Sequence, residues 1–160
     1  MNDIKNLKIR PYKKEDINEV LNIVQYHIKN TFKNKFSEPI IKFISEYHSL
    51  ESILKDSKKG IIICAELDNK IIGTVTLINN YINRLYVSYK YQNMGIGTFL
   101  MKNIEKIAFE NGNNMVELDC YIFSMMFYVK LGYKVVEKKS DYVNGDYLYY
   151  FKMEKKLSAN

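Results

Sequence analysis

The chain has 160 residues and a formal net charge of +6, with 47% hydrophobic and 26% charged residues. This is the composition of a globular domain, and it excludes a disordered or fibrous chain. No apolar run approaches the ~20 residues that span a bilayer, and the amino terminus lacks the basic and apolar regions of a secretory signal. We therefore expect a cytoplasmic protein that does not contact a membrane, with one domain over residues 1–160.

The positive charge is spread along the chain instead of being concentrated in one arm or tail. A solvated basic surface is the simpler interpretation, and it would also attract a polyphosphate ligand by long-range electrostatics. We expect no nucleic-acid partner, although a basic nucleic-acid-binding domain stays a minority alternative.

Two cysteines and two histidines bear on redox and metal chemistry. Cys64 and Cys120 fall in predicted strands among apolar neighbours, which indicates reduced core thiols. His27 and His48 have no metal-ligand residues near them in sequence, so no metal site is predicted.

The first half of the chain reads as a strand, a helical region and three strands. Residues 7–12 alternate apolar and basic side chains, and a helix with one apolar stripe follows Glu15 and Asp16. Ser37 is a candidate helix cap with Pro39 in the first turn. The remaining predicted elements are a short helix over 49–55 and strands over 61–67, 70–78 and 81–87, which form an antiparallel meander.

The second half alternates helices and strands. A helix begins at Ile96 and stops at Asn111-Gly112, and a strand over 115–120 follows, so this crossover predicts that the strands on either side are parallel. Ser124 is predicted to cap a helix that runs through Leu131, and Gly132 ends it. Strands over 133–138 and 147–153 flank the hairpin turn Asn144-Gly145. The fold class is α/β, a mixed sheet with helices on its faces.

The stretch from Gln92 to Thr98 predicts an anion site at the start of a helix. The first amides of a helix lack partners within the helix and its dipole leaves partial positive charge there, so an anion is favoured. Gly95 and Gly97 carry no side chain that would keep a ligand from the backbone, and Thr98 adds a hydroxyl donor. A dinucleotide fingerprint would require a third glycine at Leu100, and a P-loop would require a lysine after Gly97.

The spacing Gln92-x-x-Gly95-x-Gly97 after Leu85-Tyr86-Val87 resembles the acetyl-CoA signature of the Gcn5-related N-acetyltransferase (GNAT) family. The segment from Phe127 to Tyr133 resembles a second motif of the same family. The resemblance implies a mostly antiparallel mixed sheet of about seven strands, flanked by helices, in which one parallel pair of strands splays apart.

The resemblance also implies acetyl-CoA as co-substrate, with no metal. Its pantetheine arm would lie against the first splayed strand, its pyrophosphate would lie on the glycine loop, and Tyr128 would protonate the departing thiolate. The residues implied to bind it are Leu85, Tyr86, Val87, Gln92, Asn93, Met94, Gly95, Ile96, Gly97, Thr98, Ser124, Phe127 and Lys130. For Ser124 the alternative is helix capping alone, and for Lys130 it is solvation.

The implied activity is direct transfer of an acetyl group to a primary amine of a small molecule or peptide in a ternary complex. Many family members carry a glutamate as general base where this chain has Asn83, and an amide does not accept a proton at neutral pH. Asp119, Glu46, His48 and a water chain remain open as alternatives. Cys120 as an acyl-carrying nucleophile is disfavoured because no base is evident beside it.

The acceptor site is expected under residues 31–59, which mix aromatic side chains with carboxylates and suit either a cationic amine or ordinary core and surface. An alternative from another class is a non-catalytic CoA-binding or protein-binding module that retains the fold. Family members often pair subunits, so a homodimer is also left open.

Overall fold

The computed structural model describes residues 6–158, and these build one seven-stranded sheet. All neighbouring strands are antiparallel except β4 and β5, so the predicted fold class is confirmed. In spatial order the strands are β1 (Lys8–Pro11), β2 (Ile61–Leu67), β3 (Lys70–Ile78), β4 (Tyr81–Val87), β5 (Met115–Cys120), β7 (Asp146–Lys156) and β6 (Lys134–Val143).

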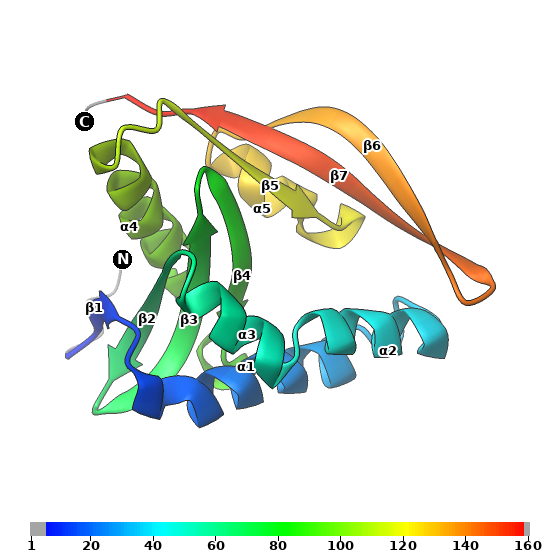
Figure 1. Cartoon of the computed structure of the whole chain (residues 1–160), viewed down its shortest axis with the longest axis horizontal. Coiled ribbons are helices and arrows are strands. Elements are labelled where there is room, and N and C mark those ends of the chain that lie inside the picture. The colour runs from blue at the N-terminus through cyan, green and yellow to red at the C-terminus, as the bar shows by residue number, and fades with distance from the viewer. Residues whose placement is uncertain (1–5, 159–160) are drawn as a thin grey trace.

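Helices cover both faces of this sheet (Figure 1). Because successive residues of a strand point to opposite faces, Ile63 and Ala65 of β2 face one core cluster while Ile62 and Cys64 face another. The first cluster packs against α4 (Ile96–Glu110) and α5 (Ile122–Lys130). The opposite face is covered by α1 (Ile17–Thr31), α2 (Glu38–Tyr47) and α3 (Leu50–Ser57), and two short 3-10 turns, η1 (Lys14–Asp16) and η2 (Tyr89–Tyr91), complete the elements.

The bounds of β2, β3, β4 and β5 are those predicted from the sequence, and α4 begins at Ile96 as expected. Gly112 adopts φ +87° just beyond α4, and Gly132 adopts φ +92° just beyond α5, which confirms both predicted helix stops. Ser37 and Ser49 occupy the N-cap positions of α2 and α3, but only the Ser49 hydroxyl accepts a cap hydrogen bond.

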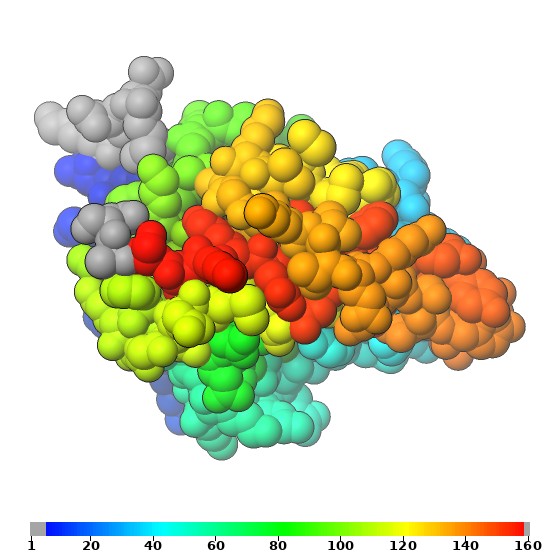
Figure 2. Space-filling view, turned by 90° about the horizontal axis from the view of Figure 1, so that it is seen from above, coloured from blue at the N-terminus to red at the C-terminus, as the bar shows by residue number. Residues whose placement is uncertain are grey.

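The last two strands are longer than predicted. They pair from Lys134 with Glu154 to Val143 with Asp146, on either side of the predicted Asn144-Gly145 turn. This hairpin projects from the body of the molecule and forms one end of it (Figure 2). The two strands continue to pair beyond their apolar residues, where most side chains are polar and exposed. The sequence pattern therefore underestimated the length of the hairpin.

A bulge in β4 and the parting of β4 from β5 shape the centre of the sheet. Thr74 and Thr76 of β3 pair with Tyr86 and Asn83, so one residue of β3 opposes two of β4. At this bulge Arg84 adopts φ +52°, and its amide donates to the Asn83 side chain at 2.7 Å. The only register pair between β4 and β5 is Tyr81 with Glu117, so the two strands separate toward their carboxyl ends.

Candidate active site

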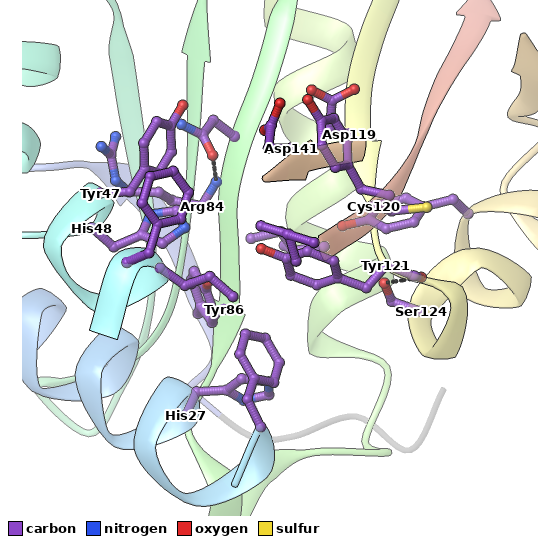
Figure 3. A pocket seen from close by; sticks show the side chains of 18 of the residues that line it. His27, Tyr47, His48, Arg84, Tyr86, Asp119, Cys120, Tyr121, Ser124 and Asp141 are labelled. Carbon is purple, nitrogen blue, oxygen red and sulfur yellow. Dashed lines mark hydrogen bonds between the residues drawn. The ribbon is translucent and has the colours of Figure 1, made fainter. Parts of the chain in front are cut away.

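A cavity of about 270 Å³ lies where β4 and β5 part. Its walls come from α1, α2, β4, β5, α5 and the β6–β7 hairpin. Figure 3 shows Tyr47 and His48 on one side of the cavity and Asp119, Cys120 and Tyr121 on the other.

Two of the three predicted residues of β4 line this cavity, and Val87 does not. Leu85 and Tyr86 line the cavity, and the Tyr86 ring packs edge-on between His27 at 5.2 Å and His48 at 5.6 Å, centroid to centroid. In the described part of the chain, β5 pairs with none of the residues of β4 beyond Tyr81. This leaves a backbone edge that an extended ligand can join as a further strand.

The loop before α4 has the backbone of an anion site. Gly95 adopts φ +83° at the N-cap position, where α4 has no side-chain cap, and Asn93 adopts φ +62°. The Gly95 carbonyl accepts the first helical hydrogen bond from Phe99 at 3.0 Å, so the amides of the first turn point out of the helix without partners. The residues present therefore fit a phosphate group.

Gly97 lies beside α5 and the end of β4, with room for ordinary van der Waals contact. A Cβ at Gly97 would lie 3.4 Å from Cζ of Phe127 and 3.9 Å from a methyl group of Val87. Phe127 thus packs against the loop, whereas Lys130 is exposed at the end of α5. Asn93 and Met94 are also exposed, and Ile96 is buried in the core.

The Gln92 side chain turns back toward β4. Its nitrogen donates to the Val87 carbonyl at 3.2 Å and lies 3.2 Å from Nδ1 of His27. The Gln92 side chain therefore joins the loop to β4 and α1, and the Gln92 amide donates to the Tyr89 carbonyl at 3.4 Å, so the phosphate contact of Gln92 stays a prediction. Burial lowers the pKa of His27 to about 4, so this imidazole is neutral at pH 7.

Tyr128 lines the cavity from α5, which lies on the other face of the sheet. Its ring packs edge-on against Phe127 at 5.0 Å and Tyr133 at 5.8 Å. Burial raises the pKa of the Tyr128 phenol above its usual value, so the hydroxyl keeps its proton at neutral pH.

The prediction that Ser124 caps α5 is wrong. The helix begins at Ile122 with Tyr121 as its N-cap residue, and the Ser124 hydroxyl donates to the Tyr121 carbonyl at 3.0 Å. Ser124 lines the cavity, as does Cys120, and the two cysteines are free and buried as predicted. Burial raises the pKa of the Cys120 thiol to about 11, so it is not an activated nucleophile.

The alternatives for the proton acceptor differ sharply in environment. Asp119 lines the cavity, its Oδ2 accepts a hydrogen bond from the Tyr81 hydroxyl at 3.2 Å, and burial raises its pKa. His48 also lines the cavity, but burial and then the nearby Arg84 lower its pKa to about 3, which makes it a weak base. Glu46 is exposed and does not line the cavity, whereas Asn83 does.

Arg84 is a cavity residue that the sequence reasoning missed. Its side chain is 2% exposed, pairs with Asp56 and donates to the Ser52 hydroxyl at 2.9 Å. An arginine at an inward position of an apolar alternation was the available signal, because such a charge must find a buried partner. Asp141 and Tyr150 were missed as well, since they reach the cavity from the hairpin, whereas Tyr47 belongs to the segment expected to cover the acceptor site.

No helix in residues 6–158 is both long and apolar enough to cross a membrane. No group of three or more histidine, cysteine, aspartate or glutamate residues in this range is placed to hold a metal ion.

Comparisons with solved structures return the same architecture. The GCN5-related N-acetyltransferase from Rhodopseudomonas palustris covers 98% of this chain and 99% of its own at 23% identity, with a TM-score of 0.86. The PaiA N-acetyltransferase from Thermoplasma acidophilum, solved in complex with coenzyme A, covers 94% and 99% at 27% identity, with a TM-score of 0.77. The ribosomal-protein-alanine N-acetyltransferase from Brucella melitensis covers 94% and 99% at 17% identity, with a TM-score of 0.70.

A search of curated proteins gave no match. The model of the Acetyltransferase (GNAT) family matches residues 25–133, a range that contains the glycine loop, both parted strands and Tyr128. The chain therefore belongs to the GNAT acetyltransferase family.

Proposed function

We propose that the protein is an acetyl-CoA-dependent N-acetyltransferase that acts on a primary amine by direct attack. The observation that carries this proposal is the opening between β4 and β5, which has an uncapped helix start at one side and the Tyr128 side chain within it. The coenzyme A complex of the Thermoplasma acidophilum relative supports the choice of donor.

Acetyl-CoA, when bound, supplies an activated acetyl group as a thioester. The first-turn amides at Ile96, Gly97 and Thr98 would hold its pyrophosphate, because unpaired amides and the helix dipole favour an anion. The unpaired edge of β4 near Leu85 would bind the pantetheine arm through the main chain. The Val87 carbonyl accepts a hydrogen bond from the Gln92 side chain, which fixes the carboxyl end of β4 to the loop before α4.

Two side chains are placed to move protons. The amine nitrogen bonds to the acetyl carbon while the carbon–sulfur bond breaks, so a proton must leave nitrogen and another must reach sulfur. Asp119 would accept the first, because its raised pKa makes it a stronger base than an exposed carboxylate. Tyr128 would donate the second, since its phenol stays protonated in the cavity.

A thermal-shift experiment with acetyl-CoA tests the donor, and liberated thiol across a panel of primary amines tests the transfer. A ligand that binds only the folded state at ~100 times its Kd adds about 2.7 kcal/mol, which raises Tm by roughly 5 °C or more for a chain of this size. Absence of any shift at millimolar acetyl-CoA would reject the proposal. A shift without thiol release for any amine would favour a non-catalytic CoA-binding module.

A further inference from the structure

The carboxyl end of α5 brings the rings of Tyr128 and Tyr133 together. The Tyr133 amide donates to the Tyr128 carbonyl at 3.0 Å. The Gly132 amide donates to the Val129 carbonyl at 3.0 Å, and Gly132 adopts φ +92°. These features define a Schellman C-cap, in which the side chains of the residues joined by the outer hydrogen bond commonly make contact. Here these residues are the two tyrosines, whose ring centroids lie 5.8 Å apart at an interplanar angle of 73°.

Tyr133 is anchored at its hydroxyl group. The residue is 2% exposed, and its hydroxyl donates to Oε1 of Glu105 on α4 at 2.9 Å. Oε2 of the same carboxylate accepts from Nζ of Lys155 on β7 at 2.6 Å. This ammonium group also lies 5.5 Å from the centroid of the Tyr133 ring. One carboxylate therefore ties the Tyr133 hydroxyl to α4 and to β7, so the ring of Tyr133 has a fixed place in the core.

This polar network is more than the packing of the core requires. Glu105 is 8% exposed, and burial and then Glu105 raise the pKa of the Tyr133 phenol, which keeps its proton and acts as the donor. Burying a carboxylate costs desolvation energy, and replacing a buried ion pair by apolar side chains of similar volume is often neutral or stabilising. A fully hydrogen-bonded network does hold its members in one orientation. The orientation that the network imposes therefore explains it better than stability does.

The position of the Tyr128 hydroxyl, by contrast, depends on the packing of its ring. This half-buried residue lines the cavity, where burial and then the Cys120 thiol raise its pKa, and its hydroxyl forms no hydrogen bond with another group in residues 6–158. Its ring contacts Phe127 at 5.0 Å and Tyr133 at 5.8 Å, centroid to centroid. Phe127 is only partly buried, whereas Tyr133 is anchored. A displacement of Tyr133 would therefore move the Tyr128 phenol within the cavity.

We infer that the hydrogen bond between Tyr133 and Glu105 positions the phenol of Tyr128 for proton transfer. This inference rests on the proposed function, in which Tyr128 donates a proton to the departing sulfur. Tyr133 and Glu105 do not line the cavity, so both are positioning residues that act through the Tyr128 ring. Proton transfer requires a donor within hydrogen-bond reach of its acceptor, about 2.6–3.2 Å between heavy atoms. A small displacement of the phenol therefore slows the chemical step without weakening binding.

Tyr133→Phe tests the inference, because it keeps the ring and removes only the hydroxyl group. We expect kcat to fall about fivefold, with KM for acetyl-CoA and for the amine unchanged within about twofold. In a Tyr128→Phe background, Tyr133→Phe should lower kcat no further, because the group that it positions is gone. An unchanged kcat in the single variant, or equal falls in the two backgrounds, would overturn the inference.

Two variants of Glu105 separate the hydrogen bond from the ion pair. Glu105→Gln keeps an oxygen acceptor for the Tyr133 hydroxyl and removes the charge that faces Lys155, so it should keep kcat within about twofold. Glu105→Leu removes the acceptor and should lower kcat as much as Tyr133→Phe. Equal losses in the two Glu105 variants would assign the effect to the ion pair and overturn the role of the hydroxyl.

Tyr12→Phe is the matched control for removing a phenol hydroxyl. The Tyr12 hydroxyl is buried, and its side chain packs against the cluster on the opposite face of the sheet. This variant should keep kcat within about twofold. A loss as large as in Tyr133→Phe would mean that kcat responds to any loosening of the core, and it would contradict a specific link to Tyr128.

A spectroscopic measurement separates the failure of this inference from the failure of the proposed function. In protein labelled with 3-fluorotyrosine, the ¹⁹F resonance of Tyr128 is the one lost in Tyr128→Phe, and observing it requires no turnover. We expect this resonance to broaden or split in Tyr133→Phe, because the ring takes more than one orientation. Broadening without thiol release from the wild type would retain the anchoring of Tyr128 and reject the transferase. A single sharp resonance in Tyr133→Phe, with thiol release from the wild type, would retain the transferase and reject the positioning role.

Discussion

The side-chain nitrogen of Gln92 lies 3.2 Å from Nδ1 of His27, and it also donates to the Val87 carbonyl. One side chain therefore joins the loop before α4 to the end of β4 and to α1. His27 lines the cavity, so a movement of α1 at the cavity would displace the predicted phosphate loop through the contact between His27 and Gln92.

Stability should fall as the pH is lowered below 6.5. The folded-state pKa values of His27 and His48, about 4 and about 3, lie below the unfolded value near 6.5, so the unfolded state binds protons first. The stabilisation is complete above pH 6.5 and is lost as the pH falls toward 4, by about 2 kcal/mol per histidine at pH 5.

Denaturant unfolding at pH 7 and pH 5 measures this loss. His48→Phe should lose about half as much stability as the wild type between the two pH values, because one of the two buried imidazoles is gone. Equal losses in both proteins would assign the acid sensitivity to other groups.

Gly95→Ala should abolish the acetyl-CoA thermal shift. Gly95 adopts φ +83° at the start of α4, and Gly112 adopts φ +87° just beyond its other end. Alanine at either position must adopt a left-handed backbone, which lowers the free energy of unfolding by about 1 kcal/mol. Gly112→Ala is therefore the matched control. If both variants keep the full shift, the glycine loop does not hold the cofactor.

Tyr128→Phe should reduce kcat by about 10²-fold or more, with little change in the affinity for acetyl-CoA. The phenol lines the cavity and keeps its proton, while its ring makes the packing contacts with Phe127 and Tyr133 that phenylalanine preserves. Steady-state kinetics and calorimetry separate the two effects. Unchanged turnover would remove the proton-donor role.

Asp56→Ala should destabilise the fold by roughly 3–5 kcal/mol, because it leaves the Arg84 guanidinium buried without a counter-ion. The control is Glu110→Ala, which removes an exposed pair with Lys106 at 3.8 Å and should cost no more than about 0.5 kcal/mol. Equilibrium unfolding in urea measures both. Similar small costs for the two variants would show that water or another group compensates Arg84.

Local features predicted much of the fold. The β-branched runs that became β2 and β3 and the alternation in β4 are properties of neighbouring residues, as is the glycine after α4. The structure corrected the length of the hairpin and the start of α5, because strand pairing and the Tyr121 cap involve contacts that apolar periodicity does not report.

The sequence by itself determined the order of the elements, the parallel relation of β4 and β5 and the glycine loop, since each depends on residues close together in the chain. Only the tertiary structure decided which side chains share the cavity. The Tyr81 hydroxyl donates to Asp119, which lies 38 positions later in the chain. Arg84 pairs with Asp56, which lies 28 positions earlier. Such partners are set by which strands pair and where a bulge turns a side chain, because a buried charge or carboxylate is satisfied in space and not along the chain.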